Sequence, residues 1–240
     1  MRLAVLSDLH ANLPALEAVL QDIAGRDVEG VIHLGDLVGY GPHPDAVVDR
    51  VRREEMTGVV GNYDLAVCDP DPAAGLARYL KPTLSEVGRR TYEWTRQHVS
   101  RETVAFLEGL PAQLRVEEGD RVFLFAHASP ERPNEYLLPD TPAARLEELF
   151  RGTGAHILVV GHTHLPLVRE VGDRLLLNPG SVGKPKDGDP RASYLILDTG
   201  RGLQVEHVRV EFAVERVVAD SVESGLPREQ AEALRLGRGV

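Results

Sequence analysis

The chain has 240 residues and a formal net charge of −10, with 42% hydrophobic and 27% charged residues, as is usual for globular proteins. It contains no apolar segment of eighteen residues, so no membrane span and no membrane partner are expected. It also lacks a dense basic segment, so a long nucleic acid is not the expected substrate. The N-terminus has no signal-peptide cleavage pattern, and Cys68 is the only cysteine, which leaves no intrachain disulfide and no thiolate metal site. We therefore expect a cytoplasmic protein.

Short apolar segments alternate with amphipathic segments over the first two thirds of the chain. Strands are predicted at residues 3–7, 30–35, 57–61, 122–126 and 156–161. Helices are predicted over 13–25, near 44–54, within 73–109 (most clearly 84–99) and near 141–151. Alternation of this kind favours a layered α/β fold.

The pattern changes after His162. Four apolar segments follow closely, with short turns between them, at residues 166–171, 174–178, 192–198 and 203–212. They indicate an antiparallel run, and hence two sheets or one mixed sheet. Helical spacing returns over 213–237, and this tail is expected to pack on the domain or on another subunit. We interpret residues 1–240 as one domain with a C-terminal helical tail near 213–240, and a homo-oligomer is one possible assembly.

Potential metal ligands follow the carboxyl ends of five predicted strands. They are Asp8 and His10, Asp36, Asn62, His127, and His162 and His164. Ligands bind at this edge in open α/β sheets. One such residue alone is usually a turn or cap residue, and we interpret His33, His98, His156 and His207 as surface or core residues. Seven at one edge are different, because without cations they would form a mutually repulsive polar cluster.

The types of ligand narrow the chemistry. Four imidazoles, two carboxylates and one amide, with no sulfur, suit manganese, iron, zinc or similar first-row ions. Seven protein ligands are too many for one catalytic ion with an open position, but they suit two ions that share a bridging carboxylate, roughly 3.5–4 Å apart. Such a pair activates a bridging water and stabilises the oxygens of an in-line displacement. Phosphoester hydrolysis is the reaction class that fits best.

The same residues lie in motifs that resemble those of the calcineurin-like metallophosphoesterase superfamily. The motifs, spread over roughly residues 1–200, are DLH (8–10), GDLV (35–38), GNYD (61–64), the lone His127, GHTH (161–164) and NPGS (178–181). The resemblance implies a four-layer α/β/β/α sandwich of two mixed sheets. The compact length and the NPGSVG turn are similar to the small bacterial phosphodiesterase branch.

The resemblance also implies how the ligands divide between two divalent ions. Asp8, His10 and His164 would hold one ion together with Asp36. Asn62, His127 and His162 would hold the other, with Asp36 as the bridge. Manganese is the favoured metal, with iron, zinc, nickel or cobalt as alternatives.

The sequence departs from the superfamily pattern at position 63. Many members carry a histidine there, which is thought to protonate the leaving group, whereas this chain has Tyr63. A phenol with an ordinary pKa of about 10 is a poor general acid–base near neutrality. We therefore expect diesters or activated esters to be preferred over alkyl monoesters. Asp64, which would orient that histidine, is interpreted as a structural turn residue.

Several further residues are candidates for the site. Asn62, Tyr63 and His43 are the candidate catalytic residues, and His43 could reach the leaving group from the loop after Asp36. Its alternative is a solvent-exposed loop residue. Tyr40, Gly180 and Ser181 are the candidate substrate-binding residues, the last two through backbone N–H groups. Simple packing at Tyr40 and a plain turn at 180–181 are the alternatives.

The predicted function is hydrolysis of a small phosphoester, most simply a phosphodiester or nucleotide, by a metal-dependent enzyme. One alternative is a non-catalytic interaction scaffold, because the retromer subunit with this fold works mainly by binding partners. The other is a nuclease that acts on oligonucleotides. The presence of all seven ligands favours the enzyme, and the acidic balance disfavours a long polymer.

Overall fold

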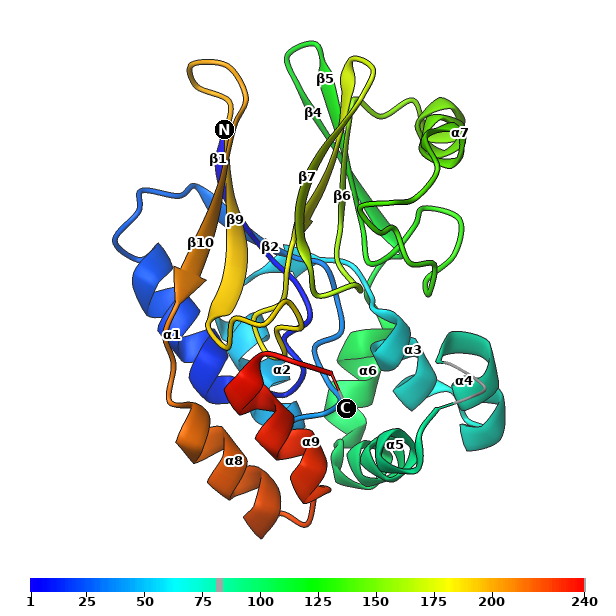
Figure 1. Ribbon diagram of the computed structural model, residues 1–240, viewed down its shortest axis with the longest axis vertical. Helices are drawn as coiled ribbons and strands as arrows, with labels where there is room; N and C mark the ends of the chain where they lie inside the picture. The colour runs from blue at the N-terminus through cyan, green and yellow to red at the C-terminus, as the bar shows by residue number, and fades with distance from the viewer. Residues whose placement is uncertain (81–83, 240) are drawn as a thin grey trace.

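The computed structural model describes residues 1–80 and 84–239, and its framework is two five-stranded mixed sheets that face each other (Figure 1). The first sheet has the order β10-β9-β1-β2-β3 and the second the order β4-β5-β6-β8-β7. The strands of the first sheet are β1 (Arg2–Leu6), β2 (Gly30–His33), β3 (Thr57–Gly58), β9 (Ala192–Asp198) and β10 (Gln204–Val210). Those of the second are β4 (Gln113–Glu118), β5 (Arg121–Ala126), β6 (Ile157–Val160), β7 (Pro166–Val171) and β8 (Arg174–Pro179).

Helices cover the outer faces of the two sheets. Along the described chain they are α1 (Leu13–Ile23), α2 (Pro44–Arg53), α3 (Asn62–Cys68), α4 (Pro72–Tyr79), α5 (Glu86–His98), α6 (Arg101–Glu108), α7 (Ala143–Thr153), α8 (Val214–Glu223), α9 (Arg228–Glu232) and the 3₁₀ helix η1 (Ala233–Leu236). In Figure 1, α1 lies outside the first sheet and α7 outside the second. The expected four-layer α/β/β/α sandwich is confirmed.

Three apolar clusters hold these layers together. Side chains such as Val5, Phe125 and Leu195 fill the space between the sheets. A second cluster joins the first sheet to the helices before β4, and a third joins the second sheet to α7 through Leu146 and Phe150. Because β1, β2, β5 and β6 all end in buried residues, packing holds their carboxyl ends together at one edge.

The second half of the chain differs in part from the antiparallel run expected after His162. β7 pairs with β8 and β9 pairs with β10, both antiparallel, but β8 also pairs with β6 in parallel and β9 pairs with β1. The chain therefore passes from one sheet to the other between Pro179 and Ala192. Residues 180–191 form this crossing and run past the carboxyl ends of strands in both sheets.

The C-terminal tail packs on the helices of the same chain, the first of the two expected arrangements. α8 contacts α1, and α9 contacts α5. The Trp94 indole N–H donates a hydrogen bond to the Ser224 carbonyl at 2.8 Å. None of the helices in the described part of the chain is long and apolar enough to cross a membrane.

His33, at the end of β2, is a buried histidine outside the cluster of predicted ligands. It is fully buried, neither ring nitrogen has a hydrogen-bond partner among the described residues, and burial lowers its pKa to about 4. A Cβ at Gly58 on the neighbouring strand would lie 2.3 Å from its ring, so the imidazole packs directly on the β3 backbone. His33 is therefore neutral in the folded protein near neutral pH.

This burial predicts a pH-dependent stability. The unfolded chain binds a proton at His33 below about pH 6.5, but the folded chain does so only near pH 4, so stability falls as the pH falls through this window. Between pH 7.5 and pH 5 the loss from this group is about 2 kcal/mol. Urea unfolding of chelator-treated protein at the two pH values should show a smaller decline for His33→Leu than for the wild type. Equal declines would show that His33 keeps an ordinary pKa in the folded state.

Candidate metal centre

The seven predicted ligands come together at the carboxyl ends of β1, β2, β3, β5 and β6. Two compact groups are present, one formed by Asp8, His10 and His164 and the other by Asp36, His127 and His162. In each group the potential ligand atoms lie within 4.8 Å of one another. All six side chains are buried, and Asn62 lies beside the second group with its amide oxygen 2.7 Å from the His127 Nε2 atom.

Hydrogen bonds to the backbone fix how three of the imidazoles face. The Nδ1 atoms of His10, His127 and His164 contact the carbonyl oxygens of Val38, Leu34 and Lys184 respectively. Because a carbonyl only accepts, each Nδ1 carries the proton of its ring, and the Nε2 lone pair is presented to the centre of the site. Burial lowers the pKa of both His10 and His164 well below its ordinary value, which keeps these rings neutral.

These lone pairs face other acceptors, an arrangement that fits cations. The Nε2 atoms of His10 and His164 are 3.2 Å apart, and neither carries a proton to share. Asn62 donates its amide N–H to the Tyr79 carbonyl at 3.0 Å, so its oxygen faces the His127 lone pair. The Asp8 Oδ1 atom has no hydrogen-bond partner among the described residues. Acceptors brought this close are stabilised only when a positive ion lies between them.

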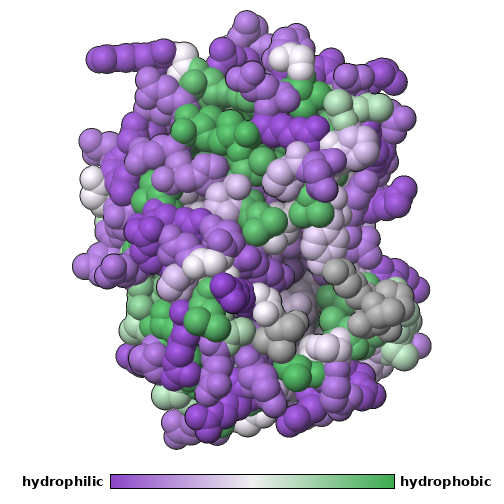
Figure 2. All heavy atoms as spheres, in the orientation of Figure 1, coloured by the Kyte–Doolittle hydropathy of each residue, from purple (hydrophilic) through white to green (hydrophobic). Residues whose placement is uncertain are grey.

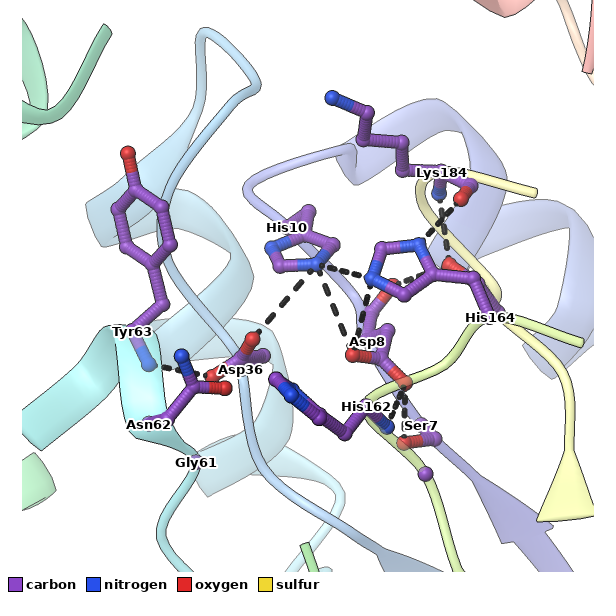
Figure 3. A network of polar contacts seen from close by, with 12 residues as sticks. Ser7, Asp8, His10, Asp36, Gly61, Asn62, Tyr63, His162, His164 and Lys184 are labelled. Atoms are coloured by element: carbon purple, nitrogen blue, oxygen red, sulfur yellow. Dashed lines mark hydrogen bonds and ion pairs between the residues drawn. The ribbon is translucent and has the colours of Figure 1, made fainter. Parts of the chain in front are cut away.

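Both carboxylates have one oxygen fixed by the protein and one directed at the centre (Figure 3). The Asp8 Oδ2 atom accepts hydrogen bonds from Ser7 Oγ and the His162 backbone N–H, at 2.6 and 3.0 Å. The Asp36 Oδ1 atom accepts the Tyr63 backbone N–H at 2.7 Å. The other Asp36 oxygen lies 3.8 Å from His10 Nε2 and 3.5 Å from His127 Nε2, so it faces both ligand groups.

Burial also raises the pKa values of these two carboxyl groups. The pKa of Asp8 rises to about 7, and that of Asp36 rises well above its usual range through burial and the neighbouring Asp64 carboxylate. Bound divalent cations would hold both groups ionised. The site is therefore built for positive charge.

Five of the ligand residues have a strained backbone. Asp8, His10, Asp36, His162 and His164 adopt positive φ angles of 53°, 46°, 52°, 65° and 60°. This left-handed region is unfavourable for residues with a Cβ atom and persists only where surrounding structure enforces it. Hydrogen bonds between loops do so here, among them Asp8 N–H to the Gly35 carbonyl and His10 N–H to the Asp36 carbonyl, at 3.1 and 2.9 Å.

The GNYD turn begins helix α3. The Asp64 carboxylate accepts the backbone N–H groups of Gly61 and Val38 at 3.0 and 3.1 Å, which is the structural role expected for it. Tyr63 is 1% exposed, its ring lies 4.8 Å from that of Tyr40, and burial raises its pKa well above the ordinary value. In Figure 3 its hydroxyl points away from Asp36 and Asn62.

The structure does not bring three of the other candidates to the metal centre. The His43 Nε2 atom contacts the Asp220 carboxylate on α8 at 3.1 Å. The Gly180 N–H donates to the Asn178 side chain at 2.8 Å, and the Ser181 hydroxyl donates to the Asp8 carbonyl at 2.8 Å. Both residues are buried, and Ser181 holds the Asp8 loop in place, so their position is that of a structural turn.

A cavity of about 670 Å³ opens over the metal centre. Figure 2 shows a hollow near the middle of the face in view, at the level where the sheets above meet the helices below. Tyr40 and Tyr63 line it together with residues that the sequence did not single out, which are Tyr79, Leu80, Leu84, Ser85, Gly88, Asn134, Tyr136, Lys184, Lys186, Gln230 and Gly239. These residues come from α4, α5, the loops before α5, α7 and β9, and the C-terminal tail, and no sequence pattern connects them.

Comparisons with known proteins agree with this arrangement. A family model, the calcineurin-like phosphoesterase superfamily domain, matches residues 1–202. An uncharacterized protein of Methanocaldococcus jannaschii is 34% identical, with 98% of each chain covered. The phosphodiesterase YfcE of Escherichia coli K12 is 29% identical over 82% of this chain and 88% of its own. The crystal structure of a metallophosphoesterase from Sphaerobacter thermophilus is 34% identical, covers 99% of both chains and has a TM-score of 0.80.

The family match covers every one of the seven ligand positions, and the structural match extends through the C-terminal tail. The chain therefore belongs to the calcineurin-like phosphoesterase superfamily, within its small bacterial and archaeal branch, and is a metal-dependent phosphoesterase.

Proposed function

We propose that this protein hydrolyses small phosphodiesters, nucleotides among them, with two divalent ions, of which manganese is favoured. The observation that carries the proposal is the pair of ligand groups that both face Asp36 Oδ2 on the floor of the cavity. Two ions held there would supply Lewis-acid stabilisation of phosphate oxygens and a water of lowered pKa.

The residues of the chain would bind and orient the ions and the substrate. Asp8, His10 and His164 would hold one ion, Asn62, His127 and His162 the other, and Asp36 both. The backbone hydrogen bonds of the imidazoles and carboxylates fix these ligands before any ion arrives, so little reorganisation is needed on binding. The walls of the cavity would exclude bulk water from the phosphate and contact its substituents through tyrosine and leucine side chains.

Two observations weigh against the alternative functions. Gln230 on α9 and Gly239 beyond it line the cavity, so the C-terminal tail limits the room for a polymer on that side, which disfavours a nuclease that acts on long chains. A non-catalytic scaffold has no need for potential metal ligands held this close together. The Nε2 atoms of His10 and His164 are 3.2 Å apart, and His127 Nε2 is 2.7 Å from Asn62 Oδ1. The similarity to a protein named phosphodiesterase supports diesters as the substrate class.

The proposal is tested with a panel of phosphodiesters, phosphomonoesters and cyclic nucleotides, each with Mn²⁺, Fe²⁺, Zn²⁺, Ni²⁺ and Co²⁺. We expect turnover of bis-p-nitrophenyl phosphate and of at least one natural diester, and loss of that turnover with a chelator. Metal-loaded protein that turned over no member of the panel would favour the scaffold. A cytoplasmic location stays a prediction.

Substitution of Tyr63 tests the expected preference for diesters. A buried phenol with a raised pKa is a weaker general acid toward the leaving group near neutrality than an imidazolium at the same position would be. We expect Tyr63→His to raise the ratio of monoesterase to diesterase activity by about tenfold. Tyr92→His on α5, a buried tyrosine outside the cavity lining, is the matched control. An unchanged ratio in Tyr63→His would show that position 63 does not reach the leaving group.

A further inference from the structure

Lys184 is a buried lysine at the edge of the metal centre. Its side chain is almost fully buried and lines the cavity. Its Nζ atom lies 3.6 Å from the centre of the Tyr40 ring. In Figure 3 the Lys184 side chain lies above His10 and His164 in the view.

The backbone of Lys184 is tied to the first ligand group. Its carbonyl oxygen accepts the Nδ1–H of His164, and its N–H donates to Ser181 Oγ, which in turn donates to the Asp8 carbonyl. The position of the ammonium group is therefore coupled to two of the ligands. Residues 180–191, which cross between the sheets, deliver it there.

The ammonium group has no ion-pair partner in the described part of the chain. No carboxylate of the described residues lies within 4 Å of it, and the carboxylates of the centre are directed at the ligand groups. Burial and the neighbouring Lys186 lower the pKa of Lys184 well below its ordinary value, and contact with the face of one tyrosine ring offsets only part of the cost of burying the charge. An anion in the cavity would supply the missing partner.

We propose that Lys184 binds an anionic oxygen of the substrate phosphate, and of the phosphomonoester left after hydrolysis of a diester, with the Tyr40 ring as its platform; inorganic phosphate would bind there as an analogue. The inference rests on the proposed phosphodiesterase function, because it assigns a further substrate-binding residue to that same site.

Tyr40 is held so that it can serve as this platform. Its backbone has a φ of 63°, and its ring meets the edge of the His10 ring, with 4.7 Å between centroids. The Tyr63 ring packs against the Tyr40 ring from another side, with 4.8 Å between the two centroids. The Tyr40 ring thus contacts both His10, a ligand of the first ion, and the Lys184 ammonium group. It therefore fixes where the ammonium group would lie relative to a bound phosphate.

Lys186 also lines the cavity but is placed differently. Its Nζ atom is 6.0 Å from the centre of the Tyr40 ring, and its side chain is less buried than that of Lys184. We therefore assign direct contact with the phosphate to Lys184. Lys186 adds positive potential that reaches the Asp8 and Asp36 carboxyl groups and attracts anionic substrates.

The test compares Lys184→Met with wild-type protein, both loaded with Mn²⁺. Methionine keeps the volume and apolar stem but removes the charge. Calorimetric titration with inorganic phosphate should give a Kd at least tenfold higher for the variant, while its metal content by mass spectrometry stays the same. Lys184→Arg should recover part of the affinity. Arg191→Met, an exposed cation paired with Asp189 on the same loop, controls for the loss of one positive charge and should leave the Kd within twofold.

Thermal unfolding separates binding from a purely structural role. Phosphate should raise the Tm of the wild type and not that of Lys184→Met, whose Tm without phosphate should be equal or higher because no buried charge remains. A Kd for phosphate within twofold of the wild type would overturn the proposal, as would a loss no larger than that of Arg191→Met.

The same proteins show which of the two proposals fails. Phosphate binding that depends on Lys184 in a protein that hydrolyses no phosphodiester would support the anion site and reject the proposed activity. Normal hydrolysis of bis-p-nitrophenyl phosphate with unchanged phosphate affinity in Lys184→Met would support the proposed activity and reject the anion site. A raised KM for the diester together with weaker inhibition by inorganic phosphate would show that the diester and phosphate both bind the ammonium group.

Discussion

Asp36→Asn is expected to lower the turnover of phosphodiesters by at least about a thousandfold, equivalent to roughly 4 kcal/mol of transition-state stabilisation. Asp36 is the one ligand side chain whose free oxygen faces both groups, at 3.8 Å from His10 Nε2 and 3.5 Å from His127 Nε2. An asparagine that kept the hydrogen bond from the Tyr63 N–H would turn its NH₂ group toward both ions. The rotated side chain would lose that hydrogen bond and still supply no negative charge.

The measurement combines activity with metal content. Initial rates on bis-p-nitrophenyl phosphate with Mn²⁺ should fall to background, and the variant should retain fewer than two ions per chain after gel filtration. Asp49→Asn, at an exposed position on α2, is the matched control and should keep both values. A variant that held two ions and kept a tenth of the wild-type rate would show that Asp36 is not the shared ligand.

Gly61→Ala is expected to destroy the same site through packing alone. A Cβ at this position would lie 2.1 Å from both the backbone N and the Oδ1 atom of Asp36. The loop carrying Asp36 would have to move, and with it the hydrogen bond that fixes the carboxylate. We expect loss of metal binding and of activity, with a decrease in the free energy of unfolding of about 3 kcal/mol.

The control for this prediction is Gly152→Ala on α7. A Cβ there meets no atom within 4 Å, and alanine favours a helix more than glycine does, so this variant should be more stable by up to about 1 kcal/mol. Urea unfolding of the wild type, Gly61→Ala and Gly152→Ala gives their free energies of unfolding directly. A Gly61→Ala variant with unchanged stability and metal content would mean that the turn before Asn62 has room that the structure does not show.

The fold could be predicted where apolar periodicity is strong, and it could not where pairing is decided by distant segments. The boundaries of α1, α2, β5, β7 and β9 agree with the expected ones within a few residues. β4 was not predicted, because Gln113–Glu118 is an edge strand with only Leu114 and Val116 as apolar residues. β3 is shorter than expected because the Val60 N–H leaves the ladder and donates to the Pro111 carbonyl instead.

The candidate site, like the fold, could be predicted from the sequence only in part. The seven ligands could be found because each follows directly on an apolar strand, a relation that is local in the sequence. The cavity could not, since Tyr79, Tyr136 and Lys184 are brought together only by tertiary packing. His43 shows the converse, because its place on the loop after Asp36 did not reveal that Asp220 on α8 would bind it.

The positive φ angles of five ligand residues have a consequence for protein engineering. Replacing residues that have a left-handed backbone by glycine is a standard way to raise thermal stability, because glycine carries no steric penalty there. In this protein five such positions supply metal ligands, so the substitutions that a stability screen would favour at them are those that remove the chemistry. Selection for heat resistance without an activity assay would drive this chain toward a robust but inert protein.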